Sequence, residues 1–448
     1  MKRKTTSNSE ITPAKSRRSF LKGLGATSVA TPVALAGLNK AATAQNNDPV
    51  IIGCPVSLTG MIAADGIEVR NGLEMAAEEL NEQGGILGRP IEVHFADTES
   101  KGDDMVIQAT QRLIDRENAS AIITSYNLET GAAMINAAAD AGIIAMHAFT
   151  STTHDDRVLA DPDRYWGIFQ YCPPERIYGE GLLDMIQTLE ETGKFDRAND
   201  KIAIINGPGS FTGQIAAAVR DGAAEHGYTI SLFETATPPV SDWGPVLAKL
   251  RADPPAVIAM THYHVQDQAQ FMNQFTTNPT DSLIYMLYGP SLGAFRDIAG
   301  ENSVGCLYSS VIGVLQDEIG TSFAARYRER YGENSSPSVG AMAYQAMFAY
   351  ATAAALAGGP GEPYDDTQNR LVAEKLKAIN IRGPVGTMRF HHDTQSAVSY
   401  PGETDDPSLG MPHIFSQIQD AKEDGYVVSP WPYAVRDYET PSWIKGGE

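Results

Sequence analysis

The sequence contains very little cysteine: among its 448 residues, Cys54, Cys172 and Cys306 are the only three. Exported proteins that depend on disulfides usually carry an even number of closely spaced cysteines, so this sequence excludes a disulfide framework. One pair could still form, with Cys54 and Cys306 as the candidates. We expect buried free thiols instead.

Basic residues are also scarce, with 34 Lys and Arg against 55 Asp and Glu and a net charge of −21. Residues 1–44 are basic, so the remainder of the chain is more acidic still. Such a charge repels phosphate backbones and anionic lipid, which excludes nucleic acid as a partner. It does not exclude a small ligand of either sign, because one pocket can differ from the average field.

Long hydrophobic runs are not evident. The apolar run LGATSVATPVALAGL (24–38) is shorter than the about 20 residues that span a bilayer. A basic segment with Arg17 and Arg18 precedes it, and an A-x-A site ending at Ala44 follows it. This pattern predicts a twin-arginine signal peptide over 1–44, cleaved near Ala44 on export to the periplasm. After it we expect no membrane span and a soluble mature chain.

Motifs for catalysis and metal binding are missing: there is no H-E-x-x-H, no cysteine pair and no G-x-S-x-G. A glycine-rich turn with Gly207, Gly209 and Gly213 lies between a strand-like and a helix-like run, and Glu234 ends the next strand. This arrangement is a weak match to the dinucleotide-binding loop and its ribose-binding acid. His262–His264 supplies two imidazoles, too few for a metal site. We therefore predict no catalytic residue, no metal, no cofactor and no enzyme activity.

Strand-like and helix-like runs alternate along the chain, beginning with the strand VIIGCPVS (50–57). Two such series are separated by an extended stretch and Pro-Pro at 165–174. They predict an α/β protein with two doubly wound, parallel-sheet lobes, and a (β/α)8 barrel is the alternative. Three successive helices at about 320–380, a hairpin in RGPVGTMRF (382–390) and an irregular tail complete the prediction.

Hydroxyl and aromatic side chains follow strand after strand, where open parallel sheets bind their ligands. The ligand-binding candidates after the first series of strands are Ser57, Asp65, Tyr126, Asn127, Phe149, Thr150, Ser151 and Thr152. The candidates after the second series are Phe211, Tyr263, His264 and Ser291, and Tyr288 also follows a strand there. Any single one could instead be a helix cap or a core ring. The recurrence is what indicates a site.

The stretch SLTG…NGLEMAAEELNEQGGILGRPIEV resembles the opening of type I periplasmic binding proteins of ABC importers, which include leucine/isoleucine/valine-binding and urea or short-chain-amide-binding proteins. The resemblance continues through AIITSY, SFTGQIAAAVRDG, YGPSLGAFRDIAG and GPVGTMRF, over most of 50–395. It implies two lobes joined by three hinge crossings, with the ligand in the cleft between them. The expected lobes are 45–170 with 303–385, and 171–302 with 386–448.

The resemblance also implies roles for individual residues. Those that would hold a carboxylate or amide are Tyr126, Asn127, Phe149, Thr150 and Ser151, and those that would complete the pocket are Asp65 and Phe211. Amino-acid binders carry an acid where this chain has Ser291, and a buried ammonium without a counter-charge costs several kcal/mol. Either Asp65 or Asp267 supplies that charge, or the ligand is a neutral amide, a urea or a carboxylate without an amine, aromatic acids included.

The predicted function is that of an exported, monomeric solute-binding protein. It would capture a small polar organic molecule by closure of its lobes and deliver it to an ABC permease. There are two alternatives. One is an exported enzyme that uses the glycine loop 207–213, and the other is a ligand-sensing module paired with a receptor.

Overall fold

The computed structural model describes residues 48–126, 131–311, 313–333 and 335–445. The predicted signal peptide and the candidate Asn127 lie outside these ranges, so the fold and the site below concern the remaining residues.

The first half of the chain builds a five-stranded sheet in the order β2-β1-β3-β4-β5, and every pairing in it is parallel. Its strands are β1 (Val50–Val56), β2 (Ile91–Asp97), β3 (Ala121–Ile123), β4 (Ile144–His147) and β5 (Ile168–Gln170). The helices between and after them are α1 (Ala63–Glu82), α2 (Asp103–Asp115), α3 (Gly131–Asp140) and α4 (Thr152–Ala160). Strands β1, β3 and β4 are almost continuously apolar and buried, as expected for a sheet that is covered on both faces.

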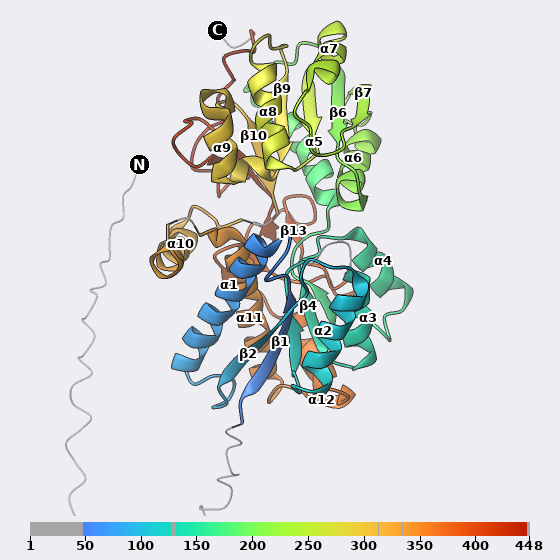
Figure 1. Cartoon of the computed structure of the whole chain (residues 1–448), viewed down its shortest axis with the longest axis vertical. Coiled ribbons are helices and arrows are strands. Elements are labelled where there is room, and N and C mark those ends of the chain that lie inside the picture. The colour runs from blue at the N-terminus through green and yellow to red at the C-terminus, as the bar shows by residue number, and fades with distance from the viewer. Residues whose placement is uncertain (1–47, 127–130, 312, 334, 446–448) are drawn as a thin grey trace, which may run out of the picture. The chain divides into compact units, whose positions relative to one another are not determined.

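A second sheet of seven strands follows, in the order β16-β15-β10-β9-β8-β6-β7 (Figure 1). Its parallel strands are β6 (Lys201–Asn206), β7 (Thr229–Thr235), β8 (Val257–Met260), β9 (Leu283–Leu287) and β10 (Leu307–Ser310). The helices that alternate with them are α5 (Arg176–Glu191), α6 (Ser210–Gly222), α7 (Gly244–Ala252), α8 (Val265–Phe275) and α9 (Gly293–Ala299), with short 3₁₀ turns η1 (Gly289–Ser291) and η2 (Gly300–Ser303). Two separate open sheets confirm the doubly wound prediction and exclude the single barrel.

The tail is more ordered than the sequence predicted. Strand β15 (Ile414–Gln417) pairs antiparallel with β10, and β16 (Tyr426–Ser429) pairs antiparallel with β15. The second sheet is therefore mixed, because the returning chain adds a hairpin to its open edge. Two short strands, β13 (Ser399–Tyr400) and β14 (Met411–Pro412), also pair with each other.

The three successive helices are α10 (Glu318–Tyr331), α11 (Pro337–Leu356) and α12 (Asp366–Ala378), and the hairpin is β11 (Ile381–Gly383) with β12 (Gly386–Met388). Both features confirm the prediction. Helix α11 corrects another expectation, because its 20 residues carry no charge and are long and apolar enough to cross a membrane. Most of it is buried, and its side chains share the core of the first sheet with those of α1, so it packs as a core helix.

Two expected lobe boundaries differ from the observed packing. Residues 303–385 were assigned to the first lobe, yet β10 lies within the second sheet, where Leu307 is in register with Tyr285 of β9. The second lobe was expected to resume at 386, yet Met388 and Phe390 lie in the core of the first sheet. The chain therefore leaves the second sheet after β10, and returns to it only with β15.

All three cysteines are buried and free, as expected. Cys54 lies in β1 of the first sheet and Cys306 directly precedes β10 of the second. Burial raises the pKa of the Cys54 thiol to about 12, which keeps it protonated and unreactive at neutral pH.

Candidate ligand-binding site

The loop between β1 and α1 is fixed by hydrogen bonds from its own backbone. The Asp97 carboxylate accepts from the N–H groups of Leu58 at 2.9 Å and Thr59 at 3.2 Å, and the Ser57 hydroxyl lies 2.8 Å from that of Thr98. Ser57 is fully buried, and its hydroxyl also accepts from the N–H of Ser100 at 3.2 Å, so its side chain supports this loop. The bonds within this loop fix the start of α1, whose first turn carries Asp65.

Asp65 meets Tyr126, the residue beyond the carboxyl end of β3. The Tyr126 hydroxyl donates to Oδ2 of Asp65 at 2.6 Å, a short bond of the kind that a charged acceptor makes. Burial raises the pKa of Asp65, and the bond from Tyr126 opposes that rise. The neighbouring charge that acts on Asp65 is that of Glu68, and no basic side chain of the described ranges acts on it.

Tyr288 approaches the same pair from the end of β9 in the other sheet. Burial raises the pKa of Tyr288, and the charge of Asp65 adds to that rise. Its backbone has φ +56° and ψ −54°, a conformation that costs a non-glycine residue about 1–3 kcal/mol. The sequence shows that Tyr288 follows a strand, but this strained conformation has no sequence signal, and we had not chosen the residue as a candidate.

A chain of aromatic rings continues from this point across the second lobe. Ring centroids lie 6.2 Å apart for Tyr178 and Phe211 and 6.1 Å apart for Phe211 and Tyr263, both edge to face. Tyr263 stacks on His264 at 4.8 Å, and at the other end Tyr178 meets His413 at 5.2 Å. These five residues form what we call the ring chain. Edge-to-face packing of this kind holds rings rigidly and offers an apolar wall.

Tyr178 belongs to the site although it was not predicted. It lies on α5, its hydroxyl accepts from the N–H of Val311 at 3.1 Å, and it belongs to the same apolar cluster as Phe211 and Tyr288. Burial raises its pKa to about 12, so it stays neutral. In the sequence it reads as an ordinary apolar position of an amphipathic helix.

The hydroxyl candidates after β4 are bonded within the protein. Ser151 caps α4 by accepting from the N–H of Thr153 at 3.3 Å, and Thr152 donates its hydroxyl to Glu175 at 2.9 Å. Thr150 is buried, and its hydroxyl donates to the Ala148 carbonyl at 3.2 Å. The structure therefore assigns these three side chains structural bonds and does not bring them to Asp65.

Phe149 packs beside this loop, with its ring 4.7 Å from that of His147. Ser291 lies in η1, and its N–H donates to the Tyr288 carbonyl at 2.8 Å. Asp267, the other possible counter-charge, is buried and bound to Nε2 of His262 at 2.8 Å. Asp267 is thus committed to a partner of its own, which leaves Asp65 as the available carboxylate.

A dinucleotide bound at the glycine loop 207–213 would need an acid to receive its ribose. The candidate for that role, Glu234, instead pairs with Nζ of Lys249 at 2.6 Å. Among the described residues, no group of three His, Cys, Asp or Glu side chains could hold a metal ion. His391 and His392 are adjacent in the sequence, and Nε2 of His391 lies 3.1 Å from Oε2 of Glu403.

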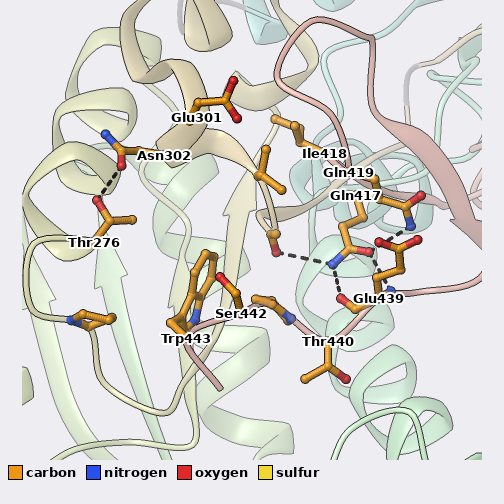
Figure 2. A pocket seen from close by; sticks show the side chains of 14 residues that line it. Thr276, Glu301, Asn302, Gln417, Ile418, Gln419, Glu439, Thr440, Ser442 and Trp443 are labelled. Atoms are coloured by element: carbon orange, nitrogen blue, oxygen red, sulfur yellow. Dashed lines mark hydrogen bonds between the residues drawn. The ribbon is translucent and has the colours of Figure 1, made fainter. Parts of the chain in front are cut away.

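A pocket of about 550 Å³ lies elsewhere, between the second sheet and the C-terminal segment (Figure 2). Its polar groups largely bond each other: Thr276 donates to Asn302 at 2.9 Å, and Nε2 of Gln417 donates to the Glu439 carbonyl at 2.7 Å. None of the predicted candidates lines it. These bonds hold the C-terminal segment against the sheet, so we take the candidate site to be Asp65, Tyr126, Tyr288 and the ring chain.

Comparison with known proteins identifies the family of the chain. Residues 49–400 match the periplasmic binding protein family. The chain belongs to that family. The type I periplasmic binding protein fold and the solute-binding role expected from the sequence are thereby confirmed.

Among the relatives of this periplasmic binding protein, a putative branched-chain amino acid ABC transporter from Silicibacter pomeroyi is 63% identical, with a TM-score of 0.87 over 88% of this chain and 100% of that one. The Leu/Ile/Val-binding protein homolog 3 of Brucella melitensis is 23% identical over 58% of this chain and 67% of its own length. The substrate-binding protein LivJ of Streptococcus pneumoniae, solved with isoleucine, is 19% identical, with a TM-score of 0.65 over 86% of this chain and 100% of that one, and shows the fold alone.

Proposed function

We propose that this protein captures a small amino acid or amino-acid-like solute, whose amine donates to Asp65 while its apolar part packs on the ring chain. The observation that carries the proposal is the half-buried Asp65 carboxylate, which has a tyrosine hydroxyl as partner and no basic side chain acting on it. A buried carboxylate of this kind favours a cationic or N–H donor group.

This proposal narrows the ligand classes that the sequence left open. A carboxylate without an amine would meet the like charge of Asp65, so it is disfavoured. A neutral amide or urea keeps an N–H donor and is the second candidate, favoured by Ser291 at the position where an acid was expected. The relatives named for branched-chain amino acids support the first candidate.

The cellular role that we propose is capture in the periplasm and delivery to an ABC permease, with the protein acting as a monomer. Residues 1–44 would direct export by the twin-arginine route and be removed near Ala44. The first lobe would carry Asp65 and Tyr126 and the second Tyr288 and the ring chain.

The test uses matched pairs of solutes that differ only in the amine. The mature protein is unfolded and refolded to remove carried solute, and calorimetry then compares leucine with 4-methylpentanoate, phenylalanine with 3-phenylpropanoate, and alanine with propanoate. We expect at least one amino acid to bind with a micromolar Kd, about −8 kcal/mol. Its amine-free partner should bind roughly 100-fold more weakly.

Two results would redirect or reject the proposal. If 4-methylpentanamide or urea binds more tightly than every amino acid, the solute is a neutral amide. If an amine-free acid binds as tightly as its amino acid, Asp65 does not receive an amine and the proposal is wrong.

A further inference from the structure

The loop after β4 lies beside the candidate site. The N–H of Ala148 in this loop donates to the carbonyl of Ser125 at 3.1 Å. Tyr126, which bonds Asp65, directly follows Ser125. Further along the same loop, Thr150 has a φ of +52°, which a β-branched residue rarely adopts. Such a conformation persists only where the surrounding structure determines it, so the groups that hold this loop have a specific task.

Two buried histidines connect this loop to a distant part of the chain. Nδ1 of His147 lies 3.3 Å from the backbone nitrogen of Phe149, and Nε2 of His147 lies 3.1 Å from Nδ1 of His154. Nε2 of His154 lies 2.9 Å from the carbonyl oxygen of Thr394. We call these three contacts the histidine relay. Thr394 belongs to residues 391–398, which lead from the hairpin β11–β12 back towards the second sheet and which we call the returning chain.

The first contact of the relay fixes the position of every proton in it. The Phe149 N–H can only donate, so Nδ1 of His147 accepts and the ring proton of His147 lies on Nε2. Nδ1 of His154 must then accept from His147, which leaves the proton of His154 on Nε2, where the Thr394 carbonyl accepts it. Both rings are therefore neutral, in agreement with burial, which lowers the pKa of each histidine.

A second link to the returning chain starts on the other side of Thr150. The Ser151 N–H donates to Oε1 of Gln170 at 2.7 Å, and the amide nitrogen of Gln170 donates to the Ser396 hydroxyl at 3.4 Å. The backbone N–H of Gln170 also donates to the Gln395 carbonyl at 3.0 Å. The two links therefore hold the loop on both sides of its strained residue to neighbouring residues of one segment.

We propose that His147 and His154 are positioning residues of the candidate site. Their relay holds the loop after β4, and with it the adjoining end of β3, in place against the returning chain. The inference rests on the proposed function and deepens it, because it joins the solute site at Asp65 to the segment that leads back to the second lobe.

The first experiment observes the protons of the relay directly. Nuclear magnetic resonance of the wild-type mature protein with isotope-labelled histidine distinguishes the two neutral tautomers of each ring, and His147→Gln and His154→Asn assign the signals. We expect both residues in the tautomer that carries its proton on Nε2. A proton on Nδ1 of either ring would overturn the inference.

The second experiment interrupts the relay at His154 and measures the effect at Phe149. His154→Asn and His154→Leu have nearly the same shape, but only Asn keeps an oxygen that can accept from His147. His262→Leu is the control, since His262 is also fully buried and bonds Asp267 in the second lobe at 2.8 Å. Amide hydrogen exchange gives the protection of the Phe149 N–H, and calorimetry on the solute pairs gives Kd.

We expect His154→Leu to speed exchange at Phe149 about three- to tenfold and to raise Kd by a similar factor. His154→Asn should recover most of both losses, because His147 again has its acceptor. His262→Leu should leave exchange at Phe149 within twofold of wild type. Equal behaviour of the Asn and Leu variants would show that bulk at this position, and not the order of protons, holds the loop, and would overturn the inference. So would an equal effect of His262→Leu on exchange at Phe149.

The two proposals can fail separately. If wild type binds no member of the panel, the proposed function fails, while the tautomers and exchange at Phe149 still decide whether the relay holds the loop. If wild type binds as expected but His154→Leu keeps its Kd, the function stands and the positioning role fails. The tautomer measurement uses wild type, so it decides the inference even if His154→Leu does not fold.

Discussion

The two lobes contribute different chemistry to the candidate site. On the first lobe the hydroxyls after β4 are used by the protein itself, as in the cap by Ser151 and the bond from Thr152 to Glu175. On the second lobe the contribution is the ring chain, in which Tyr263 is 37% exposed and Phe211 is half-buried. A hydroxyl after a strand serves equally well as a cap, whereas a partly exposed ring has no structural need to be there.

The largest effect is expected from Asp65→Asn, which removes the charge of the first lobe but keeps its shape. Affinity for the amine-bearing solute should fall roughly 100-fold, about 2.7 kcal/mol, because a buried ammonium loses its counter-charge. The amine-free partner should bind equally well or better. Calorimetry on each matched pair measures both changes.

The control for this variant is Asp104→Asn, which makes the same change at an exposed position in the first turn of α2. It should leave both affinities within twofold of wild type. A uniform loss for both members of a pair in Asp65→Asn would show that the carboxylate only supports the fold.

The pH dependence of solute affinity should also distinguish the contribution of Asp65 in the first lobe from that of the rings in the second. Burial raises the pKa of Asp65, so this carboxylate takes up a proton at a higher pH than an ordinary aspartate. Affinity for an amine-bearing solute should therefore fall as the pH is lowered through this raised pKa, by up to about tenfold per pH unit once below it. Binding of an amine-free solute to the rings should stay constant or improve.

Buried histidines set the lowest pH at which the protein stays folded and its affinity can be measured. Burial lowers the pKa of His154 from 6.5 to about 4 and that of His413 to about 3. Their neutral forms contribute stability that is present above pH 6.5 and is lost as pH falls through these lowered values. Circular dichroism at each pH therefore defines where the affinities can be compared, and a flat affinity profile within that range would contradict the role of Asp65.

Two smaller effects are expected from Thr152→Val, which should change stability but not affinity, and from Phe211→Leu, which should change affinity but not stability. Thr152→Val removes the bond to Glu175 and should lower the free energy of unfolding by about 1 kcal/mol, with Kd within twofold. Phe211→Leu should leave stability nearly unchanged and weaken binding about fivefold, roughly 1 kcal/mol, by breaking the ring chain. Denaturant unfolding and calorimetry on both variants give the comparison, and a loss of affinity in Thr152→Val would return that hydroxyl to the site.

The smallest effect concerns the backbone of Tyr288. Replacement by Gly and by Ala removes the ring equally, but Gly tolerates a φ of +56° and Ala does not. The Gly variant should be more stable than the Ala variant by about 1 kcal/mol in denaturant unfolding. Equal stability would show that this backbone relaxes once the ring is gone.

Much of the fold could be predicted because its signals are local. Alternating apolar runs marked the strands of both sheets up to β10, the three helices α10 to α12 and the hairpin at β11. The strands β15 and β16 were missed, since they are short and lie in a Gly- and Pro-rich tail. Strand β15 is stabilised by pairing with β10 about a hundred residues earlier, and β16 by pairing with β15.

The site was predicted less well, for the same physical reason. Asp65, Tyr126 and Phe211 were identified by type and position; Asp65 and Tyr126 share a hydrogen bond, and Phe211 packs against Tyr178. Tyr178 was not a candidate, because it is one of several apolar positions of the helix α5, and the strained backbone of Tyr288 has no sequence signature. The roles of the predicted residues in ligand binding remain predictions that the variants above will test.

The sequence by itself determined the elements up to the hairpin at β11 and β12, the family and the buried state of the cysteines, because each follows from local periodicity or from an ordered series of motifs. Only the tertiary structure decided which hydroxyls serve the fold and which meet at Asp65. A hydrogen bond depends on the distance between two atoms, and Asp65 and Tyr126, 61 residues apart in the sequence, bond only because the fold brings the first turn of α1 close to the residues after β3.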